Sequence, residues 1–281
     1  MPELPEVETV VRGLKHLEGQ TLSQIKINDP RVWFESELTH KELRNTKLHK
    51  IDRRGKYLLY RFSNCDILQH LRMTGKMLAA SSPAIPSNVL KEKTKKVQLR
   101  CEFHFAKEVL YFYDIRRFGT LTAVKNWEKY WQQKKLAPDP LLNTKDALSY
   151  FLSAVKGKQK PVKTLLMDQT LLLGAGNIYA DEVLHQEGIH PEQKSERLKE
   201  HDWVKIFQSL INIFENAIQS KGTTVVNYLG ADGKAGSYGE LLQVYSRENE
   251  ECLRCGKRSK IKRIILSGRS SHFCPNCQRK K

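Results

Sequence analysis

The sequence predicts an α+β protein with a helix and a β-sheet first, then a hinge, a helical domain and a small zinc module. Three observations predict it. Runs typical of β-strands are frequent in the first half, the residues after 144 show helical periodicity, and four closely spaced cysteines lie near the C-terminus. A length of 281 residues suggests about two domains at ~150 residues each. Hydrophobic residues at 40% and charged residues at 28% are typical of globular proteins, which excludes wholesale disorder.

Residues 5 to 18 are predicted to form the first helix. Apolar residues recur there at helical spacing, and Pro5 suits a first turn. Six short runs follow that are typical of strands, several of them alternating in polarity: residues 25–27, 57–62, 67–71, 97–105, 109–113 and 120–124. Residues 79–96 are rich in Ser, Pro and Lys and predict a mobile loop.

The second half has helical periodicity. A hinge is expected at residues 132–143, which contain Pro138-Asp139-Pro140. Helices are expected at 146–155, 162–167, 177–186 and 203–219, and a glycine-rich loop at 230–239. Residues 171–176 join two of the helices through a glycine-containing turn. Such a pair can bind DNA through backbone amides at a helix N-terminus, although an ordinary helical hairpin explains the pattern equally well.

The charge favours a polyanionic partner. Lys and Arg number 48 against 31 Asp and Glu, a net charge of +17, and nucleic acid is the commonest intracellular polyanion. A basic surface that serves only solubility is the alternative. From Cys252 to Lys281 there are ten Lys/Arg and no Asp/Glu, a segment suited to phosphate. No membrane-length apolar run and no secretory signal is visible, which predicts a soluble intracellular protein.

The six cysteines divide into two kinds. Cys65 and Cys101 stand alone in apolar surroundings and are expected to be buried. The other four form two Cys-x2-Cys pairs, 18 residues apart, and predict one structural zinc: Cys252, Cys255, Cys274 and Cys277. Disulfides are the alternative, disfavoured in a reducing compartment. Between the pairs, residues 261–270 predict a hairpin with Arg269 at its tip.

The N-terminus offers a candidate nucleophile. No Ser-His-Asp set, phosphate-binding loop or dinucleotide motif is present. After removal of Met1, Pro2 would present a secondary amine just before a helix N-terminus, which disfavours the protonated form. An amine that attacks an aldehyde-like carbon forms a Schiff base, and Glu3 or Glu6 could move the proton. A plain Pro/Glu-rich helix start is the alternative.

Motifs along the whole chain resemble the bacterial formamidopyrimidine-DNA glycosylases. They begin with Met-Pro-Glu-Leu-Pro-Glu-Val-Glu-Thr-Val at residues 1–10. The others are Arg-Gly-Lys-Tyr-Leu (54–58), His-Leu-Arg-Met-Thr-Gly (70–75), Asp-Ile-Arg-Arg-Phe-Gly (114–119), Met-Asp-Gln (167–169), Gly-Asn-Ile-Tyr-Ala-Asp-Glu (176–182) and the finger ending Cys-Pro-Asn-Cys-Gln (274–278). The related endonuclease VIII branch usually has glycine at the position of Leu4 and fits less well.

The resemblance implies a bifunctional DNA glycosylase and abasic-site lyase of base excision repair. Its substrates would be oxidised purines such as 8-oxoguanine and formamidopyrimidines. Pro2 would form a Schiff base with the deoxyribose and Glu3 would protonate the sugar. Lys56 would assist β-elimination, and Arg269 would hold phosphates and assist δ-elimination. The implied fold is an N-terminal β-sandwich flanked by helices, a helix–two-turn–helix domain and a four-cysteine finger holding one structural zinc ion.

The resemblance also implies how double-stranded damaged DNA would be held. Met73, Arg116 and Phe118 match residues that fill the space left by an extruded base, with Arg116 bonding to the orphaned partner base. Without the resemblance, their motifs are ordinary strand ends. Four further residues would hold phosphate: His70, Lys158, Lys163 and Asn177. Such contacts give salt-dependent affinity.

The chain departs from the family pattern in four places. Thr94-Lys95-Lys96 stands where a histidine-containing stretch is typical, and Val226 replaces a commonly basic residue in the loop that caps the extruded base. Residues 246–251 replace a glycine- and proline-containing pattern, and the gap between the cysteine pairs is slightly longer than usual. The lesion preference is therefore left open, and the hairpin is expected to be shifted rather than lost.

The predicted organisation is a catalytic β-sandwich domain at 1–132, a hinge at 133–143, a helix–two-turn–helix domain at 144–239 and a zinc finger at 240–281. The expected protein is a monomer in the bacterial cytoplasm, associated with the nucleoid through DNA and with no membrane. Three alternatives remain: a specialised paralogue with another lesion preference, a non-catalytic zinc-finger DNA-binding protein, and a ribosomal or transcriptional zinc ribbon. A zinc ribbon would explain the high positive net charge but not the candidate nucleophile at the N-terminus.

Overall fold

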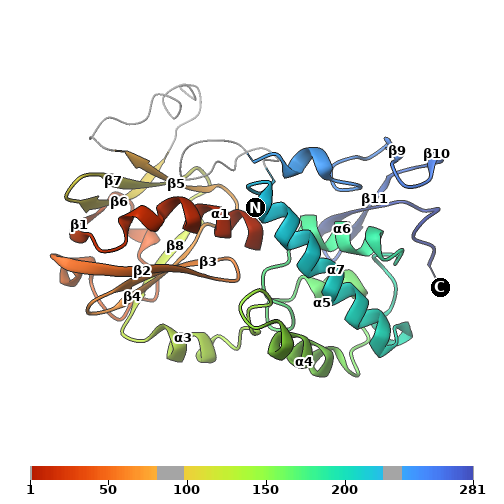
Figure 1. The fold of residues 1–281 in the computed structure, drawn as a ribbon, viewed down its shortest axis with the longest axis horizontal. Coiled ribbons are helices and arrows are strands. Elements are labelled where there is room, and N and C mark those ends of the chain that lie inside the picture. The colour runs from red at the N-terminus through yellow and green to blue at the C-terminus, as the bar shows by residue number, and fades with distance from the viewer. Residues whose placement is uncertain (1, 81–97, 224–235, 281) are drawn as a thin grey trace. The chain divides into compact units, whose positions relative to one another are not determined.

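The computed structural model describes residues 2–80, 98–223 and 236–280, and its elements follow the chain as drawn in Figure 1. The chain divides into unit 1, residues 1–134 with 218–239, and unit 2, residues 135–217 with 240–281. Most of the predicted loops at 79–96 and 230–239, with Thr94-Lys95-Lys96 and Val226, lies outside the described residues. The bounds of the four predicted segments stay a prediction.

Unit 1 is built on eight antiparallel strands in the order β5-β7-β6-β1-β2-β3-β4-β8. Their bounds are β1 Thr21–Ile27, β2 Thr46–Arg54, β3 Tyr57–Phe62, β4 Asp66–His70, β5 Gly75–Ala80, β6 Leu99–Phe105, β7 Val109–Asp114 and β8 Thr120–Val124. Strands β1 and β2 are joined by only two residue pairs, Thr21 with Lys47 and Leu22 with Thr46. The strands therefore form two groups of four that meet at this narrow seam.

The two groups of strands enclose one hydrophobic core. Ile25 and Phe103 from one group and Ile51, Tyr60 and Ile67 from the other belong to the same buried cluster. The rings of Tyr60 and Phe103 stack across the groups with centroids 5.6 Å apart. The predicted β-sandwich is thus confirmed, with its layers on two sides of a shared interior.

Helices complete unit 1. Helix α1 (Leu4–Leu14) continues into the 3-10 turn η1 (Lys15–Leu17), and its apolar face joins the sandwich core, as its periodicity predicts. Helix α3 (Trp127–Gln133) packs its aromatic residues on the outer face of β3, β4 and β8. Two further 3-10 turns are η2 (Pro30–Val32) and η3 (His40–Leu43). Helix α3 and strands β2 and β5 were not predicted.

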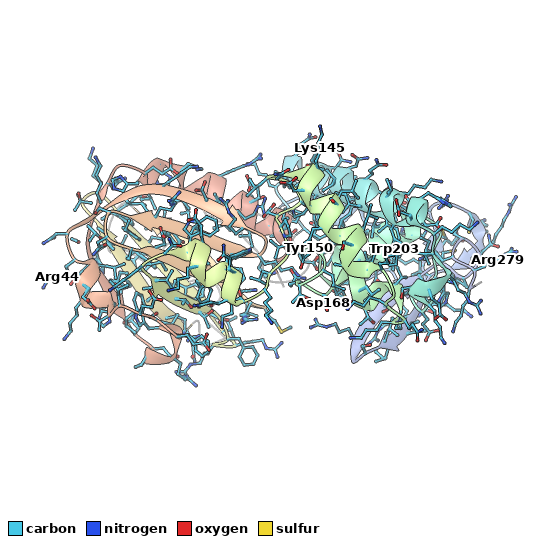
Figure 2. The ribbon with its side chains drawn as sticks, turned by 90° about the horizontal axis from the view of Figure 1, so that it is seen from below. Arg44, Lys145, Tyr150, Asp168, Trp203 and Arg279 are labelled. Carbon is cyan, nitrogen blue, oxygen red and sulfur yellow. The ribbon has the colours of Figure 1, made fainter. Side chains whose placement is uncertain are left out.

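Unit 2 is helical and carries the finger. Its helices are α4 (Thr144–Val155), α5 (Val162–Leu166), α6 (Asn177–Gln186) and most of α7 (Glu200–Gln219), with the 3-10 turn η4 (Ser195–Arg197) between α6 and α7. The 3-10 turn η5 (Tyr238–Leu241) has residues in both units. Helices α4 and α7, which carry Tyr150 and Trp203, lie side by side (Figure 2), and Phe151 packs edge-on against Trp203 at 5.6 Å between centroids. The finger strands are β9 (Glu251–Cys252), β10 (Gly256–Lys260), β11 (Lys262–Leu266) and β12 (Arg269–Phe273).

The four helices predicted in the second half are all present, within a few residues at each end. Among the helices that the structure describes, none is long and apolar enough to cross a membrane.

Candidate active site and metal centre

The predicted nucleophile lies at the buried start of helix α1. Pro2 is buried, and Glu3, the residue that caps the helix, has an extended backbone with φ of −105° and is only 1% exposed. Pro5 fits the first turn because its missing N–H has no partner to lose there. The sequence thus places an imino acid and a buried carboxylate at the positive end of a helix.

Glu6 holds this N-terminal segment in place. Its Oε2 accepts the backbone N–H of Glu3 at 2.9 Å, and its Oε1 accepts the backbone N–H of Thr223 at 2.8 Å. Gly222 has φ of +79°, and a Cβ there would lie 3.1 Å from the Glu6 side chain. Glycine is therefore required at this close approach. The carboxylate acts as an acceptor that ties the start of the chain to residues 222–223.

Lys56 occupies a tight turn that is tied to the same helix. Arg54 pairs with Tyr57, so Gly55 and Lys56 form a two-residue turn, with Gly55 at φ of +54°. The Arg53 side chain, buried beside this turn, donates from Nε to Glu8 of α1 at 2.9 Å. Helix α1 and the turn that carries Lys56 are thereby fixed to one another.

His70 is buried beside Lys56 and is neutral. Its Nδ1 accepts the backbone N–H of Arg72 at 2.9 Å, so the ring hydrogen of the neutral imidazole lies on Nε2. The ring packs edge-on against Tyr57 with centroids 4.6 Å apart. Burial lowers the pKa of His70 well below its usual value, and the positive charges of Arg72 and Lys56 lower it further. At neutral pH, His70 can act only as a neutral donor.

This burial predicts a pH dependence of stability. Unfolded His70 takes up a proton near pH 6.5, while the folded protein keeps the imidazole neutral, so the free energy of unfolding falls as the pH drops below about 6.5. Between pH 7.5 and 5.5 the wild type is expected to lose roughly 1 kcal/mol more than His70→Asn. Urea unfolding at both pH values measures this, and equal losses in the two proteins would contradict it.

Three predicted void-filling residues come together on two adjacent turns. Nη1 of Arg116 lies 2.8 Å from the sulfur of Met73, and its guanidinium lies 5.0 Å from the centre of the Phe118 ring. Phe118 is 54% exposed and Met73 is 43% exposed, which is unusual for apolar side chains of this size. The cluster therefore presents an apolar wedge and a cation at the protein surface.

The turn before helix α6 is braced by an amide side chain. Gln169 donates from Nε2 to the carbonyls of Met167 and Ala175 and accepts the N–H of Gly174 at 2.9 Å. Asn177 is the first residue of α6, and Gly176 before it has no side chain with which to cap the helix. Among the described residues, Oδ1 of Asn177 has no hydrogen-bond partner. The positive end of the helix dipole at this position suits an anion.

The two lysines of the predicted phosphate-binding set differ. Lys158 is exposed on the loop that follows α4. Lys163 is 1% exposed, and its Nζ lies 2.7 Å from a carboxylate oxygen of Asp181 and donates to the carbonyl of Ser270 at 2.7 Å. It also donates to Oγ of Ser271 at 2.8 Å. Lys163 therefore joins α5 and α6 to the finger hairpin.

Arg269 lies at the tip of that hairpin. Leu266 pairs with Arg269, and the two residues between them, Ser267 and Gly268, have φ of +49° and +74°. This is the pattern of a type I′ turn, which matches the twist of a hairpin. The Arg269 side chain is exposed.

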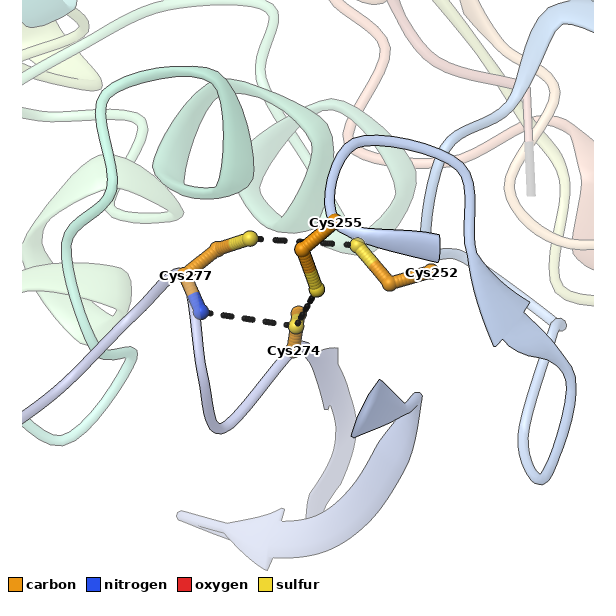
Figure 3. Close-up of side chains that lie close together, drawn as sticks. All are labelled: Cys252, Cys255, Cys274 and Cys277. Carbon is orange, nitrogen blue, oxygen red and sulfur yellow. Dashed lines mark hydrogen bonds between the residues drawn. The ribbon is translucent and has the colours of Figure 1, made fainter. Parts of the chain in front are cut away.

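Four cysteines form a metal-binding cluster in the finger (Figure 3). Their sulfur atoms all lie within 4.8 Å of one another, with 3.9 Å between Cys252 and Cys277 and 3.7 Å between Cys255 and Cys274. A zinc tetrahedron with ~2.3 Å bonds has edges of about 3.8 Å, so the spacing fits one structural zinc ion and is far too long for disulfides. The four cysteines fill all four coordination positions of the zinc, and none is left for a catalytic water or a substrate.

Two acidic residues in the Gly-Asn-Ile-Tyr-Ala-Asp-Glu motif support the finger. Asp181 pairs with Lys163 and accepts the backbone N–H of His272 at 2.9 Å. Glu182 accepts the backbone N–H groups of residues 243, 244 and 245, and burial raises its pKa. The sequence offered no indication of the contacts to residues 243–245 and 272, because these partners lie more than 60 residues away.

Comparisons with known proteins agree along the chain. Family models match residues 1–121 (formamidopyrimidine-DNA glycosylase N-terminal domain), 136–228 (its H2TH domain) and 249–279 (a zinc finger found in FPG and IleRS). The formamidopyrimidine-DNA glycosylase of Streptococcus pneumoniae is 39% identical, with 100% of both chains covered. That of Listeria monocytogenes is 36% identical, with 99% of this chain and 100% of the relative covered.

Solved structures of a Lactococcus lactis protein have the same fold. One is a complex of an FPG mutant with DNA that contains Fapy-dG, with a TM-score of 0.88, 35% identity and coverage of 99% of this chain and 100% of that one. Another is a complex with DNA that contains an abasic site, with a TM-score of 0.87 and the same identity and coverage.

Proposed function

The chain belongs to the formamidopyrimidine-DNA glycosylase family and is a DNA glycosylase of base excision repair; from this we propose how its residues divide the reaction. The observation that carries the proposal is the buried Pro2-Glu3 start of helix α1, fixed by Glu6. The reaction would consist of base excision followed by cleavage of the DNA strand at the resulting abasic site.

Pro2 is the nucleophile in this proposal. Once Met1 has been removed, its nitrogen attacks C1′ of the damaged nucleotide and the bond from C1′ to the base breaks. The base leaves with the electrons of that bond and takes up the proton that the Pro2 nitrogen loses. Glu3 gives a proton to the ring oxygen of the sugar, which opens the ring and leaves an iminium ion on Pro2. Burial of both residues supports this assignment, because a site closed to water protects the iminium from hydrolysis.

Lys56 and Arg269 assist the eliminations. The iminium makes the C2′ proton acidic, and its loss expels the 3′ phosphate in β-elimination. A second elimination, δ, expels the 5′ phosphate and removes the sugar. Lys56 binds phosphate in the first step, and its link to α1 through Arg53 and Glu8 supports its assignment to the same site. Arg269, from its hairpin tip, holds the phosphates that flank the lesion.

Three other residues contact the DNA in this proposal, and a fourth acts indirectly. His70, as a neutral Nε2–H donor, and Asn177, at the start of α6, bind phosphate oxygens. Lys158 adds an exposed charge. Lys163 was predicted from the resemblance as a further phosphate contact, and its three interactions instead support an indirect role, in which it fixes the hairpin that carries Arg269.

Met73, Arg116 and Phe118 fill the space of the extruded base. Phe118 wedges the base stack and Met73 fills the hole, while the guanidinium of Arg116 offers paired donors to the orphaned base, cytosine in the preferred substrate. The exposed apolar surface of Phe118 and Met73 supports this assignment.

We propose oxidised purines, 8-oxoguanine and formamidopyrimidines, as the damaged bases. The relative whose complex contains Fapy-dG supports the second class. The protein would act as a monomer in the cytoplasm, with double-stranded DNA as its partner and association with the nucleoid as the consequence.

Borohydride trapping tests this proposal. The protein is incubated with a duplex carrying 8-oxoguanine opposite cytosine, and sodium borohydride reduces the iminium to a stable covalent adduct. The adduct is expected to map to Pro2 and to form much more slowly in Pro2→Gly, whose primary amine can still form a Schiff base but lacks the proline ring. An adduct only with a preformed abasic site would mean an intact lyase with another base preference, as in a specialised paralogue. No adduct on either duplex, with Met1 absent, would contradict the proposal.

A further inference from the structure

A buried arginine lies directly behind the two turns that carry the void-filling residues. Arg100 of β6 is fully buried, with 0% of its side chain exposed. Its Nε lies 3.1 Å from Oδ2 of Asp29, and its Nη1 lies 3.6 Å from Oδ2 of Asp114. A buried ion pair recovers its desolvation cost only with good geometry and full partners, so it does not by itself favour stability. The position of Arg100 beside the two turns points to a role in holding them in place.

Asp114 joins the two turns to one another. Its Oδ1 accepts the hydroxyl of Thr74 in a short hydrogen bond and the backbone N–H of Arg116 at 3.2 Å. Its Oδ2 accepts the backbone N–H of Gly119 at 2.6 Å. The Asp114 carboxylate therefore binds Thr74, which follows Met73, and backbone N–H groups on both sides of Phe118. The guanidinium of Arg100 lies beside this carboxylate as an ion pair, without a hydrogen bond to it.

Asp29 fixes the second turn from another direction. The side chain of Arg117 donates from Nε to Oδ2 of Asp29 at 2.7 Å. Arg117 has φ of +61°, a backbone conformation that costs energy in a residue with a Cβ. Arg117 stands between Arg116 and Phe118 in the chain, so its conformation sets the direction of both neighbours. Because Arg100 also binds Asp29, it connects the anchors of both turns.

We propose that Asp29, Arg100 and Asp114 form a positioning array that sets the discrimination of the orphaned base by Arg116. This rests on the proposed function of Arg116 as the contact to that base. Paired hydrogen bonds to a base edge depend on the position of the guanidinium to a fraction of an ångström. The array fixes the backbone N–H of Arg116, while the sulfur of Met73 and the ring of Phe118 fix its tip.

Arg100→Lys tests the array while it keeps the charge. A lysine has one compact ammonium group and cannot present two separate nitrogens to Asp29 and Asp114. The readout is the affinity for a duplex with a tetrahydrofuran abasic analogue opposite cytosine, divided by the affinity with adenine opposite, measured by fluorescence anisotropy. The wild type is expected to prefer cytosine, and Arg100→Lys is expected to lower the ratio about tenfold, the effect of about 1.4 kcal/mol.

Glu102→Gln is the matched control on the same strand. The Glu102 carboxylate interacts with Lys26, Asn28 and His104, none of which belongs to the two turns. This variant is expected to keep the wild-type ratio. Asp29→Asn removes the charge that Arg100 and Arg117 share, and it is expected to lower the ratio even if Arg100→Lys fails to fold.

General destabilisation lowers both affinities together and leaves their ratio unchanged, so a merely structural role gives a different result. An unchanged ratio in folded Arg100→Lys and Asp29→Asn would overturn the proposal, and so would a wild type without preference for cytosine. The analogue cannot react, so the ratio is independent of trapping at Pro2. Failure of the Schiff-base chemistry is therefore distinguishable from failure of the array.

Discussion

Glu3→Gln is expected to lose base excision while it keeps cleavage of a preformed abasic site. Excision needs a proton at the sugar ring oxygen, and a glutamine cannot supply it, so the excision rate should fall about 10²–10⁴-fold. An abasic sugar already exists in part as an open aldehyde, and Pro2 can form the Schiff base there without an acid. Single-turnover assays on 8-oxoguanine and abasic duplexes measure the two rates. The change from carboxylate to amide is nearly isosteric, and the Glu3 backbone bond to Glu6 is unaffected.

Glu108→Gln serves as the control for this change of charge. Its carboxylate interacts with His16 and Gln20, away from the start of α1. It should excise 8-oxoguanine at the wild-type rate. If Glu3→Gln lost both activities equally while its melting temperature stayed unchanged, Glu3 would be needed for strand cleavage as well, and the assignment of its proton to ring opening would be wrong.

Local patterns in the sequence predicted much of the fold. The periodicity of α1 and of the four helices after residue 144 was visible, because each buries one face and keeps the other polar. The two-residue spacing within each cysteine pair predicted the zinc cluster, since one tight turn supplies two thiolates. The hairpin with Arg269 at its tip likewise followed from the apolar run that precedes Ser267-Gly268.

Elements whose burial depends on distant partners escaped prediction. Strand β2 is rich in Lys and Arg, and Arg53 is buried there only because Glu8 of α1 meets it. Helix α3 has seven residues, too few for a clear periodicity, and its aromatic residues pack on the outer face of the sheet. Short elements and buried charges depend on contacts across the fold, which a single sequence does not display.

The same limit applies to the candidate site. Motif resemblance brought together Met73, Arg116 and Phe118, which the structure places in contact, but it offered no role for Asp29 or Arg100. The hydrogen-bond partners of the buried Lys163 lie more than 100 residues along the chain. A lysine in a basic, polar segment has the same appearance in a sequence whether it faces DNA or an internal carboxylate.

Cys274→Ser is expected to abolish zinc binding and, as a consequence, to weaken the binding of the finger to DNA. The finger core that the structure describes is small, and it includes Cys252 and Cys274 themselves beside Val244 and Ile261. Zinc-finger peptides draw about 10–16 kcal/mol from metal binding, so a core of this size should not stay folded without it. Metal analysis should show the loss of one zinc per chain, and hydrogen exchange should show loss of protection in residues 251–273.

The effect on strand cleavage follows from Arg269. Unfolding of the hairpin moves this residue from its type I′ turn and removes the anchors at Ser270 and Ser271 for Lys163. Cleavage of an abasic duplex at limiting enzyme should fall about 100-fold or more, the effect of losing about 3 kcal/mol of binding. Cys65→Ala, in the sandwich core, should keep its zinc. Wild-type cleavage by zinc-free Cys274→Ser would show that the hairpin folds without the metal or that Arg269 is dispensable, and comparison with Arg269→Ala separates these two explanations.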